Sequence, residues 1–363
     1  MRFVLLCSLA ACTVPAVPKP AGDDTDTDAA TVDTDGVGDP PEDTVDSVDP
    51  VDTPEADTPD AVDTPADTGC QSGDTDQDGV LDCEDLCVNV ANPLQTDLDG
   101  DDEGDECDLD IDGDSVPNDF DEWPLDPMWP GVATSETIYP HTSSELFSFN
   151  VVTLNLNRIG AFQVGGGQVT DIAINQFGVL YAITFTDLYI CRPSDANCRQ
   201  IGTLSGISNN GLTFLPPAAV GGPGTLVGMG GNDWFEIYDN GNRWRSRPIG
   251  SFTGGATSSG DAFSIEGVGT FAALQESNNG PSDDIYAINP ANGATLGLVV
   301  TFDRGGGYSQ IWGLAGWTDG YIYAFDAGGD ILRVDVANQS YARVDSTNHS
   351  WWGAGVRTVI PTP

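Results

Sequence analysis

Residues 284–302 read DIYAINPANGATLGLVVTF, the clearest copy of a unit that recurs through the C-terminal half of the chain. Two runs rich in apolar and β-branched residues flank a tip, residues 289–293, built from Asn, Pro, Ala and Gly. This pattern predicts a β-hairpin. Similar stretches, each with Asn, Asp, Pro or Gly at its tip, begin at Glu145, Asp187, Trp234 and Asp330. Successive starts lie 42, 47, 50 and 46 residues apart.

A second unit precedes most of these hairpins, and its copies begin at Asp171, Gly211, Asp261 and Ile311. Together the two units give four strands in every 40 to 50 residues, which is typical of β-propeller blades. The sequence therefore predicts an all-β fold, with a propeller domain over residues 133–363. Five hairpins predict five blades, with a sixth, degenerate blade as the alternative. A β-sandwich is the rival fold, but it does not explain the repeats.

The first hairpin lacks inner strands of its own. The chain end from Trp352 onwards and the segment around residues 137–139 are the candidates to supply them and to close the ring. The hairpin at Asp284 is similar to the LYxIDPxTG hairpins of β-propellers in extracellular bacterial proteins. That resemblance implies an architecture and no chemistry, because this fold hosts binding and catalysis alike.

Residues 74–121 carry a carboxylate at almost every second position and contain no Lys or Arg. A calcium loop takes its oxygen ligands from positions 1, 3, 5, 7, 9 and 12, with Gly at position 6. Three successive loops match this spacing, with Gly79, Asp102 and Ser115 at position 6. The predicted Ca²⁺ ligands are Asp74, Asp76, Asp78, the carbonyl of Val80, Asp82 and Asp85; Asp97, Asp99, Asp101, Asp105 and Asp108; and Asp110, Asp112, Asp114, Asn118 and Asp121.

No amphipathic helices flank these loops, so the segment is not an EF-hand pair. It resembles the thrombospondin type 3 repeat over about residues 70–126. The resemblance rests on the DxDxDG runs, on the linker from Asn92 to Gln95, and on Cys87 and Cys107, which frame that unit. It implies a helix-poor rod, residues 70–128, whose core is lined by calcium. The alternative is an acidic disordered tail, but a solvated tail needs neither the ligand spacing nor the interleaved cysteines.

Eight cysteines are present, of which Cys7 and Cys12 belong to the N-terminal targeting segment. The remaining six suggest three disulfides and an oxidising compartment. The thrombospondin resemblance implies a Cys87–Cys107 bond, which leaves Cys70 and Cys83 as a pair. For Cys191 and Cys198 we expect a local bond across a hairpin, and two buried thiols are the alternative.

Residues 1–11 read as a short signal peptide, with Arg2 followed by an apolar run. Leu9-Ala10-Ala11-Cys12 resembles the bacterial lipobox, which implies cleavage before Cys12 and its lipidation. An ordinary secretory signal is the alternative. Residues 12–69 are rich in Asp, Thr and Pro, so we expect a disordered linker. No other run is long and apolar enough to span a bilayer. These features predict a lipid-anchored protein at the outer membrane or cell surface.

The formal net charge is −45, with 57 Asp and Glu against 12 Lys and Arg. Such a charge excludes nucleic acid as a partner and disfavours anionic membrane surfaces. Membrane contact is therefore expected through the lipid anchor only, and the expected partners are calcium ions and an extracellular protein or glycan.

The propeller sequence contains no catalytic motif, and its two histidines, His141 and His349, are expected to be structural or exposed. One surface is a candidate ligand face. If residues 240–241 form a two-residue turn, the strands pair Trp234 with Arg247, Glu236 with Arg245 and Tyr238 with Arg243. Such a face suits acidic sugars or carboxylates, and ordinary cross-strand pairing is the alternative. The remaining tryptophans of the domain are expected to pack between blades: Trp312, Trp317, Trp351 and Trp352.

Three functional hypotheses follow. The first is a calcium-binding surface lipoprotein that presents its propeller for protein or glycan binding. The second is a propeller hydrolase or lyase acting on an extracellular saccharide or lactone, with strand-start acids such as Asp171 and Asp261 clustered at the central channel. The third is a structural envelope component without a specific ligand. We favour the first, because no nucleophile or base motif supports the second.

Overall fold

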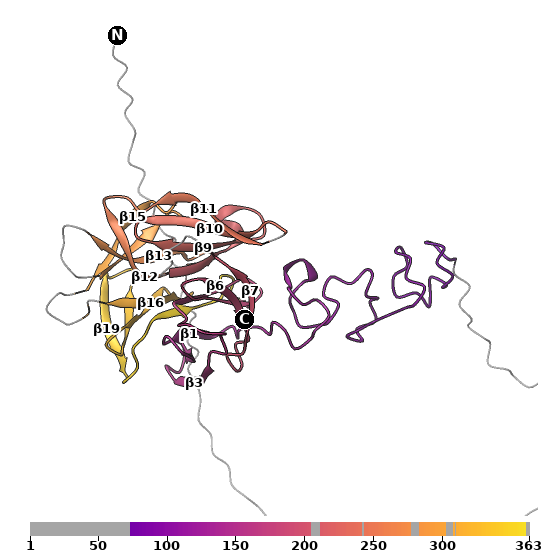
Figure 1. The fold of residues 1–363 in the computed structure, drawn as a ribbon, viewed down its shortest axis with the longest axis horizontal. Helices are drawn as coiled ribbons and strands as arrows, with labels where there is room; N and C mark the ends of the chain where they lie inside the picture. The colour runs from indigo at the N-terminus through magenta and orange to yellow at the C-terminus, as the bar shows by residue number, and fades with distance from the viewer. Residues whose placement is uncertain are drawn as a thin grey trace, which may run out of the picture. The chain divides into compact units, whose positions relative to one another are not determined.

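The computed structural model describes residues 73–204, 211–241, 243–276, 283–302, 308 and 310–360 of the chain (Figure 1). Every described residue lies in one compact unit of the chain, Thr68–Pro363. The predicted signal peptide, the lipidated Cys12, the linker and Cys70 all lie outside the described residues.

Twenty strands in the described part of the chain form five four-stranded sheets, which we number as blades 1 to 5. Blade 1 is ordered β20 (Gly353–Gly355), β1 (Thr137–His141), β2 (Glu145–Asn150) and β3 (Leu156–Ala161). Blade 2 contains β4 (Asp171–Ile174), β5 (Leu180–Ile183), β6 (Asp187–Cys191) and β7 (Cys198–Thr203). Blade 3 contains β8 (Gly211–Leu215), β9 (Thr225–Gly230), β10 (Asp233–Asp239) and β11 (Trp244–Ser251). Blade 4 contains β12 (Ala256–Ile265), β13 (Gly269–Glu276), β14 (Asp283–Ile288) and β15 (Thr295–Thr301). Blade 5 contains β16 (Ile311–Gly316), β17 (Tyr321–Asp326), β18 (Asp330–Asp335) and β19 (Ser340–Ser346).

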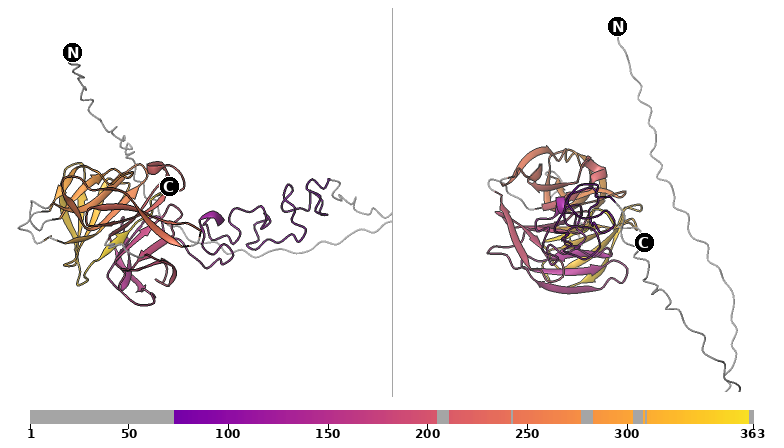
Figure 2. Two further views of the ribbon diagram at one scale, coloured as in Figure 1. Left: turned by 45° about the horizontal axis from the view of Figure 1, so that its top comes forward. Right: turned by 90° about the vertical axis from the view of Figure 1, so that its right-hand side faces the viewer.

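The inner strands of the five blades contact one another in a closed cycle, from β4 to β8, β12, β16, β20 and back to β4 (Figure 2). The chain end closes this ring: β20 pairs antiparallel with β1, with Tyr139 opposite Gly355. The prediction of a five-bladed propeller closed by the two ends of the domain is therefore confirmed.

The hairpin of residues 284–302 illustrates how local sequence builds a blade. Its two strands, β14 and β15, pair antiparallel. At the tip, the Asn289 N–H donates to the Ala294 carbonyl at 2.8 Å, and the Gly293 N–H donates to the Asn289 carbonyl at 2.8 Å. Gly293 has φ +71°, and a Cβ there would stand 2.6 Å from the Cβ of Trp234. Glycine is therefore required both for the turn and for the packing of blade 4 on blade 3.

Apolar side chains from neighbouring blades fill the space between the sheets. Trp234 is fully buried against Phe252 and residues of blade 4, and Trp351 is fully buried among residues of blades 1 and 5. Trp317 is also buried. Two of the four tryptophans expected to pack between blades therefore do so, whereas Trp312 and Trp352 are half-exposed.

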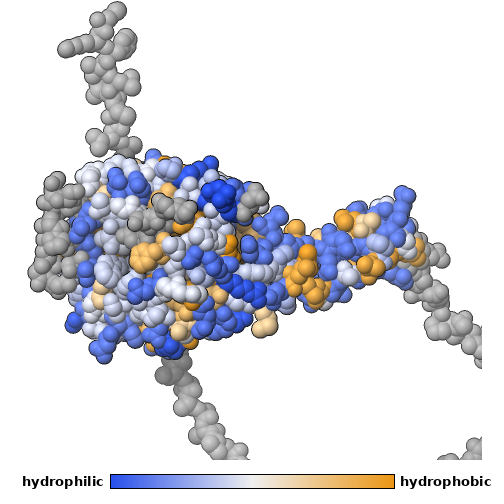
Figure 3. Space-filling view, viewed as in Figure 1, coloured by the Kyte–Doolittle hydropathy of each residue, from blue (hydrophilic) through white to orange (hydrophobic). Residues whose placement is uncertain are grey.

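Residues 73–136 contain no strand and only one short 3₁₀ helix, η1 (Asn118–Phe120). Apart from η1, the only helix among the described residues is α1 (Pro217–Val220). Neither helix of the described part is long or apolar enough to cross a membrane. Several apolar side chains of the N-terminal segment are exposed (Figure 3), including Leu94 and Leu109 at 80% and 78%. Hydrophobic packing therefore contributes little to the order of the first two acidic loops, residues 74–108.

A disulfide and a polar network hold the N-terminal segment together. Cys87 is bonded to Cys107, the pair that the thrombospondin resemblance implies. The fully buried Asn92 donates its backbone N–H to Asp78 Oδ2 at 2.8 Å, and the Gln95 side-chain amide donates to Asp85 Oδ1 at 2.8 Å. Cys83 is also disulfide-bonded, and its predicted partner lies outside the described residues.

Candidate functional site

The three acidic loops adopt the same backbone geometry. In each loop the first aspartate accepts a backbone N–H from the residue at position 6. These bonds run from Gly79 to Asp74 at 3.1 Å, from Asp102 to Asp97 at 3.2 Å and from Ser115 to Asp110 at 3.0 Å. The position-6 residues all have positive φ, +101°, +77° and +77°. Asp102 and Ser115 thus take the conformation that glycine adopts in the first loop.

Carboxylates at positions 1, 3 and 5 converge in every loop. Ligand atoms lie within 4.8 Å of one another in three sets: Asp74, Asp76 and Asp78; Asp97, Asp99 and Asp101; and Asp110, Asp112 and Asp114. Three like charges this close repel one another strongly unless they are protonated or share a cation. The position-9 side chains behave differently, because they brace their own loops. Both oxygens of Asp82 accept hydrogen bonds from Thr75, and Asn118 Oδ1 accepts the Ile111 N–H.

Six buried carboxylate oxygens at predicted ligand positions have no hydrogen-bond partner among the described residues. They are Asp76 Oδ2, Asp85 Oδ2, Asp110 Oδ1, Asp112 Oδ2, Asp114 Oδ2 and Asp121 Oδ2. Four of the six belong to the third loop, where Asp112 is only 4% exposed. A buried carboxylate oxygen without a partner is costly. This loop therefore has the donor set, the enclosure and the unsatisfied oxygens that a hard, oxygen-seeking cation requires.

The last residue of the third loop directs one oxygen inward. Asp121 Oδ1 accepts the Trp123 N–H at 2.8 Å, which leaves Oδ2 unpartnered. Asp85 does the same in the first loop, where Oδ1 accepts the Cys87 N–H at 2.8 Å. One oxygen thus fixes the side chain to the backbone, and the other remains available as a ligand.

The third loop raises the pKa of several of its own carboxyl groups. Burial, together with neighbouring carboxylates, raises the pKa of Asp114 to about 7 and that of Asp121 to about 6, although backbone hydrogen bonds act in the opposite direction. The pKa of Asp112 is also raised, first by burial. A bound divalent cation would reverse this effect and hold all three groups ionised.

The third loop is packed into the propeller. Val116 is buried in the same apolar cluster as Tyr181 and Ile183 of blade 2. Phe120, in η1, lies against Phe177 with ring centres 4.8 Å apart. The residues that anchor the loop were not predicted from sequence, although an aromatic run directly after an acidic loop is a signal that could have indicated them.

The anchor itself is a cation–aromatic cluster. The Arg199 guanidinium on β7 lies 4.8 Å from the ring centre of Trp123 and 4.1 Å from that of Trp129. It also pairs with Asp126 at 3.0 Å. Arg192 lies 5.3 Å from the Trp129 ring and donates to the Met128 carbonyl at 3.3 Å. Both arginines stand beside Cys191 and Cys198, which form a disulfide across the β6–β7 hairpin.

The strands that carry the predicted Arg–aromatic face, β10 and β11, pair in a different register from the predicted one. Asp239 pairs with Trp244, so residues 240–243 form a longer connection than the predicted two-residue turn. Its geometry is set by the Asn240 side chain, which accepts the Arg243 N–H at 3.2 Å. Arg243 consequently lies in the loop.

The two-residue shift moves every predicted cross-strand pair. Glu236 stands opposite Arg247 and Tyr238 opposite Arg245. Arg247 bonds to Glu236 at 2.5 Å and lies 5.2 Å from the Tyr238 ring centre. Trp234 is fully buried and donates its indole N–H to the Pro290 carbonyl at 3.0 Å. The face therefore presents one internally paired arginine and has no exposed tryptophan.

The strand-start acids meet near the axis, but they are enclosed. Asp171 Oδ2 accepts the Leu212 N–H of blade 3 at 2.5 Å. Asp261 Oδ2 accepts the N–H groups of Leu314 and Ala354, in blades 5 and 1, at 2.7 and 2.9 Å. Burial raises the pKa of both carboxyls, and their side chains are hydrogen-bonded to each other. They join neighbouring blades through backbone amides.

His141 completes this buried group. Its Nε2 lies 3.5 Å from Asp171 Oδ1, and burial lowers its pKa to about 4, so the imidazole is neutral. A Cβ at Gly353 would stand 2.2 Å from Asp171 Oδ1, which shows how tightly the closing strand β20 covers the group. The adjoining axial space, lined by residues such as Ile172 and Phe263, measures only about 10 Å³. No substrate-sized cavity reaches these acids through it.

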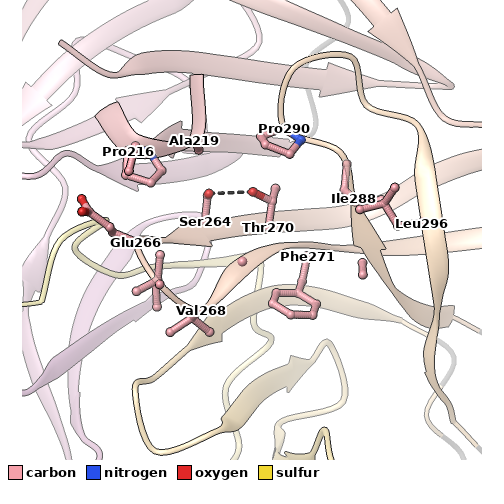
Figure 4. Close-up of a pocket in the computed structure, with 15 residues that line it drawn as sticks. Pro216, Ala219, Ser264, Glu266, Val268, Thr270, Phe271, Ile288, Pro290 and Leu296 are labelled. Carbon is pink, nitrogen blue, oxygen red and sulfur yellow. Dashed lines mark hydrogen bonds between the residues drawn. The ribbon is translucent and has the colours of Figure 1, made fainter. Parts of the chain in front are cut away.

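Two larger pockets lie elsewhere on the propeller. One of about 460 Å³ lies between α1, the β12–β13 turn and the β14–β15 hairpin (Figure 4). Its Ser264 and Thr270 hydroxyls are bonded to each other at 2.7 Å, and Glu266 is its one ionisable lining residue. The other, of about 260 Å³, lies at the axis, where several inner strands begin.

Comparisons with known proteins find similarity to solved structures alone. No protein-family model and no curated protein matches the chain. Among solved structures, a chain of the nidogen/laminin complex is similar, with a TM-score of 0.38 and 11% identity over 61% of this chain and 81% of that one. BamB from Moraxella catarrhalis is similar with a TM-score of 0.30 and 9% sequence identity, over 60% of this chain and 62% of that one. A protein of unknown function from Bacteroides caccae is similar with a TM-score of 0.35 and 10% sequence identity, over 58% of this chain and 73% of that one. At these identities no activity or partner is transferred.

Proposed function

We propose that this protein is a calcium-binding lipoprotein of the cell surface, in which an acidic rod presents a five-bladed propeller for the binding of an extracellular protein or glycan. The observation that carries the calcium part is the third loop, with its four buried and unpartnered carboxylate oxygens around Asp112. The surface location rests on the lipobox resemblance at Cys12 and on the two disulfides of the described residues.

Calcium is the cation that the donor set favours. The converging side chains are carboxylates, with no Cys or His among them, so softer metals that prefer sulfur or imidazole are disfavoured. Calcium accepts six to eight oxygens in a flexible arrangement, whereas magnesium requires near-ideal octahedral geometry and retains waters. Irregular loops suit the more permissive ion.

A binding role is favoured over the alternatives because the buried acids inside the propeller have structural roles. The buried acids Asp171 and Asp261 bond to backbone amides of neighbouring blades, and neither carboxyl lines either of the two larger pockets. The hydrolase or lyase alternative needs open carboxylates in a cavity, and no observation favours it. The structural-component alternative differs from our proposal only in lacking a ligand, so a binding measurement separates them.

Terbium luminescence tests the metal site. Tb³⁺ occupies calcium sites and is excited by a nearby indole, and Trp123 is close in the chain to Asp121, to which its backbone N–H donates. We expect emission excited at the tryptophan band that calcium displaces, with a heat of calcium binding in calorimetry. Asp114→Asn is expected to remove this signal, and Asp119→Asn is the matched control because Asp119 is exposed in η1 and makes the same charge change. Equal emission from Asp114→Asn and Asp119→Asn would refute the site.

A further inference from the structure

The axial pocket of about 260 Å³ is formed where the inner strands of several blades begin. Its lining residues are Thr170, Phe185, Ser259, Gly260, Trp312 and Trp352. They come from blades 2, 4 and 5 and from the approach to β20. A pocket lined from several blades depends on the closed fold, and its size, near the lower end for ligand sites, suits a small molecule or one ring of a longer chain.

Three aromatic side chains give this pocket its character. Trp312 and Trp352 meet edge to face, with ring centres 6.1 Å apart and planes at 79°. Both are half-exposed, and Phe185 is 60% exposed. Neither tryptophan belongs to the apolar clusters that pack between blades. Two half-buried indoles that pack on each other outside these clusters leave apolar ring surface available to a ligand.

The backbone around the pocket is fixed before any ligand binds. The Trp352 N–H donates to the His141 carbonyl at 2.8 Å, which ties the pocket wall to strand β1. A Cβ at Gly260 would stand 2.5 Å from the Trp312 Cα, so blades 4 and 5 approach as closely as glycine allows. Preorganised walls reduce the entropy lost on binding.

The pocket also selects by charge. None of the described residues that line it ionises near neutral pH, and the net charge of −45 repels anions. The Thr170 and Ser259 side chains supply the hydroxyl groups of its wall, and the Thr170 hydroxyl donates to the Ile183 carbonyl at 3.3 Å. Its oxygen therefore remains to accept a hydrogen bond, so a suitable ligand is neutral, offers O–H donors and has a flat apolar face.

A pyranose ring meets these conditions, because its axial C–H groups form an apolar face and its hydroxyls donate. We propose that the axial pocket binds one ring of a neutral saccharide, with the ring face on Trp352 or Trp312 and a hydroxyl directed to Thr170. This assignment rests on the proposed binding role and narrows its glycan branch. It differs from the Arg–aromatic face of β10 and β11, which would select acidic sugars.

The test uses the mature full-length protein in calcium, with cellohexaose, maltohexaose and N-acetylchitohexaose as neutral probes and hexagalacturonate as the acidic probe. Calorimetry and saturation-transfer NMR measure binding. We expect at least one neutral probe to bind and hexagalacturonate not to bind. Trp352→Ala and Trp312→Ala should each weaken binding by about tenfold or more, and Tyr238→Ala, on the β10–β11 face, should leave it unchanged.

Near-ultraviolet circular dichroism confirms that each variant is folded, and Trp352→Phe is a milder substitution that keeps an aromatic face. Retained binding in Trp352→Phe together with loss in Trp352→Ala supports the stacking role. The proposal is overturned if no neutral probe binds, if the acidic probe binds instead, or if both tryptophan-to-alanine variants bind normally. Terbium emission in the same samples reports the metal site independently, so failure of the saccharide assignment is distinguishable from failure of the calcium proposal.

Discussion

The guanidinium of Arg199 lies 4.1 Å from the ring centre of Trp129, and this contact fastens the segment after the third acidic loop to blade 2. Arg199 also faces Trp123 and pairs with Asp126. The candidate metal loop and the propeller are therefore mechanically connected, because Trp123 follows the last predicted ligand, Asp121, by two residues. The calcium proposal therefore predicts that a change of metal state in the loop affects blade 2 through these contacts.

Removal of the Arg199 side chain should loosen this connection. We expect Arg199→Ala to lower the free energy of unfolding by about 1–2 kcal/mol, mainly through the two lost ring contacts and the packing of the arginine stem. The ion pair with Asp126 is more than one-third exposed on both sides, so it should add little. Urea denaturation of Arg199→Ala, with Arg245→Ala as control within about 0.5 kcal/mol of wild type, measures the effect. A wild-type midpoint for Arg199→Ala would argue against the anchor.

Stability without metal should depend on pH in a direction set by Asp114. The pKa of this carboxyl is raised to about 7 in the folded protein, against 3.8 for an unperturbed group. The folded state therefore binds more protons than the unfolded state between these values, and its stability falls as pH rises from about 4 to 7.

The difference between wild type and Asp114→Asn isolates this group from His141 and other titrating residues. In chelator, the free energy of unfolding of wild type relative to Asp114→Asn should decline between about pH 4 and 7. In excess calcium this decline should disappear. A difference curve that is flat in chelator would show that Asp114 does not titrate there.

The Cys191–Cys198 disulfide should help to hold Arg192 and Arg199 in position. It spans seven residues of sequence across the β6–β7 hairpin, next to Arg192 and Arg199. A loop of this length predicts a loss of about 2 kcal/mol when both cysteines are replaced by alanine. Chemical denaturation measures the loss, and tryptophan fluorescence reports whether Trp129 becomes more exposed. If reductant leaves the midpoint of the wild-type protein unchanged, the bond contributes nothing.

Membrane attachment should depend on Cys12 alone. We expect Cys12→Ala to abolish incorporation of labelled palmitate and to release the protein from the detergent phase, because the lipobox resemblance places the acyl chains on that residue. Cys7→Ala is the matched control, since Cys7 lies in the predicted signal peptide. Continued partition of Cys12→Ala into detergent would indicate another mode of attachment.

Local signals in the sequence were sufficient for the propeller. Turn residues such as Asn289 and Gly293 fix a hairpin through contacts within a few residues, and repetition of that unit gives the blade count. The β10–β11 register failed for an equally local reason, because the Asn240 side chain closes a longer loop than an Asn-Gly pair suggests. A shift of two residues keeps the same face but changes every partner.

Contacts between residues far apart in the chain could not be predicted from the sequence. Asp171 and Asp261 are far apart in the chain and meet only because the ring closes. Their hydrogen bonds from the backbone N–H groups of Leu212 and Leu314 depend on the spacing between blades. The ligand spacing of the acidic loops was readable, but the burial of Asp112 depends on packing of the third loop against blade 2. The half-exposed Trp312 and Trp352 were likewise mistaken for packing residues.

Scanning calorimetry of the full-length protein in calcium and in chelator is the most direct test of the central claim, that a metal in the acidic loops is part of this fold. A ligand at 100 times its dissociation constant stabilises the native state by about 2.7 kcal/mol. For a domain of this size that is a rise in melting temperature of roughly 5–10 °C. Our account predicts this rise for wild type and Asp119→Asn and a smaller one for Asp114→Asn. The same melting temperature for wild type in calcium and in chelator would contradict it.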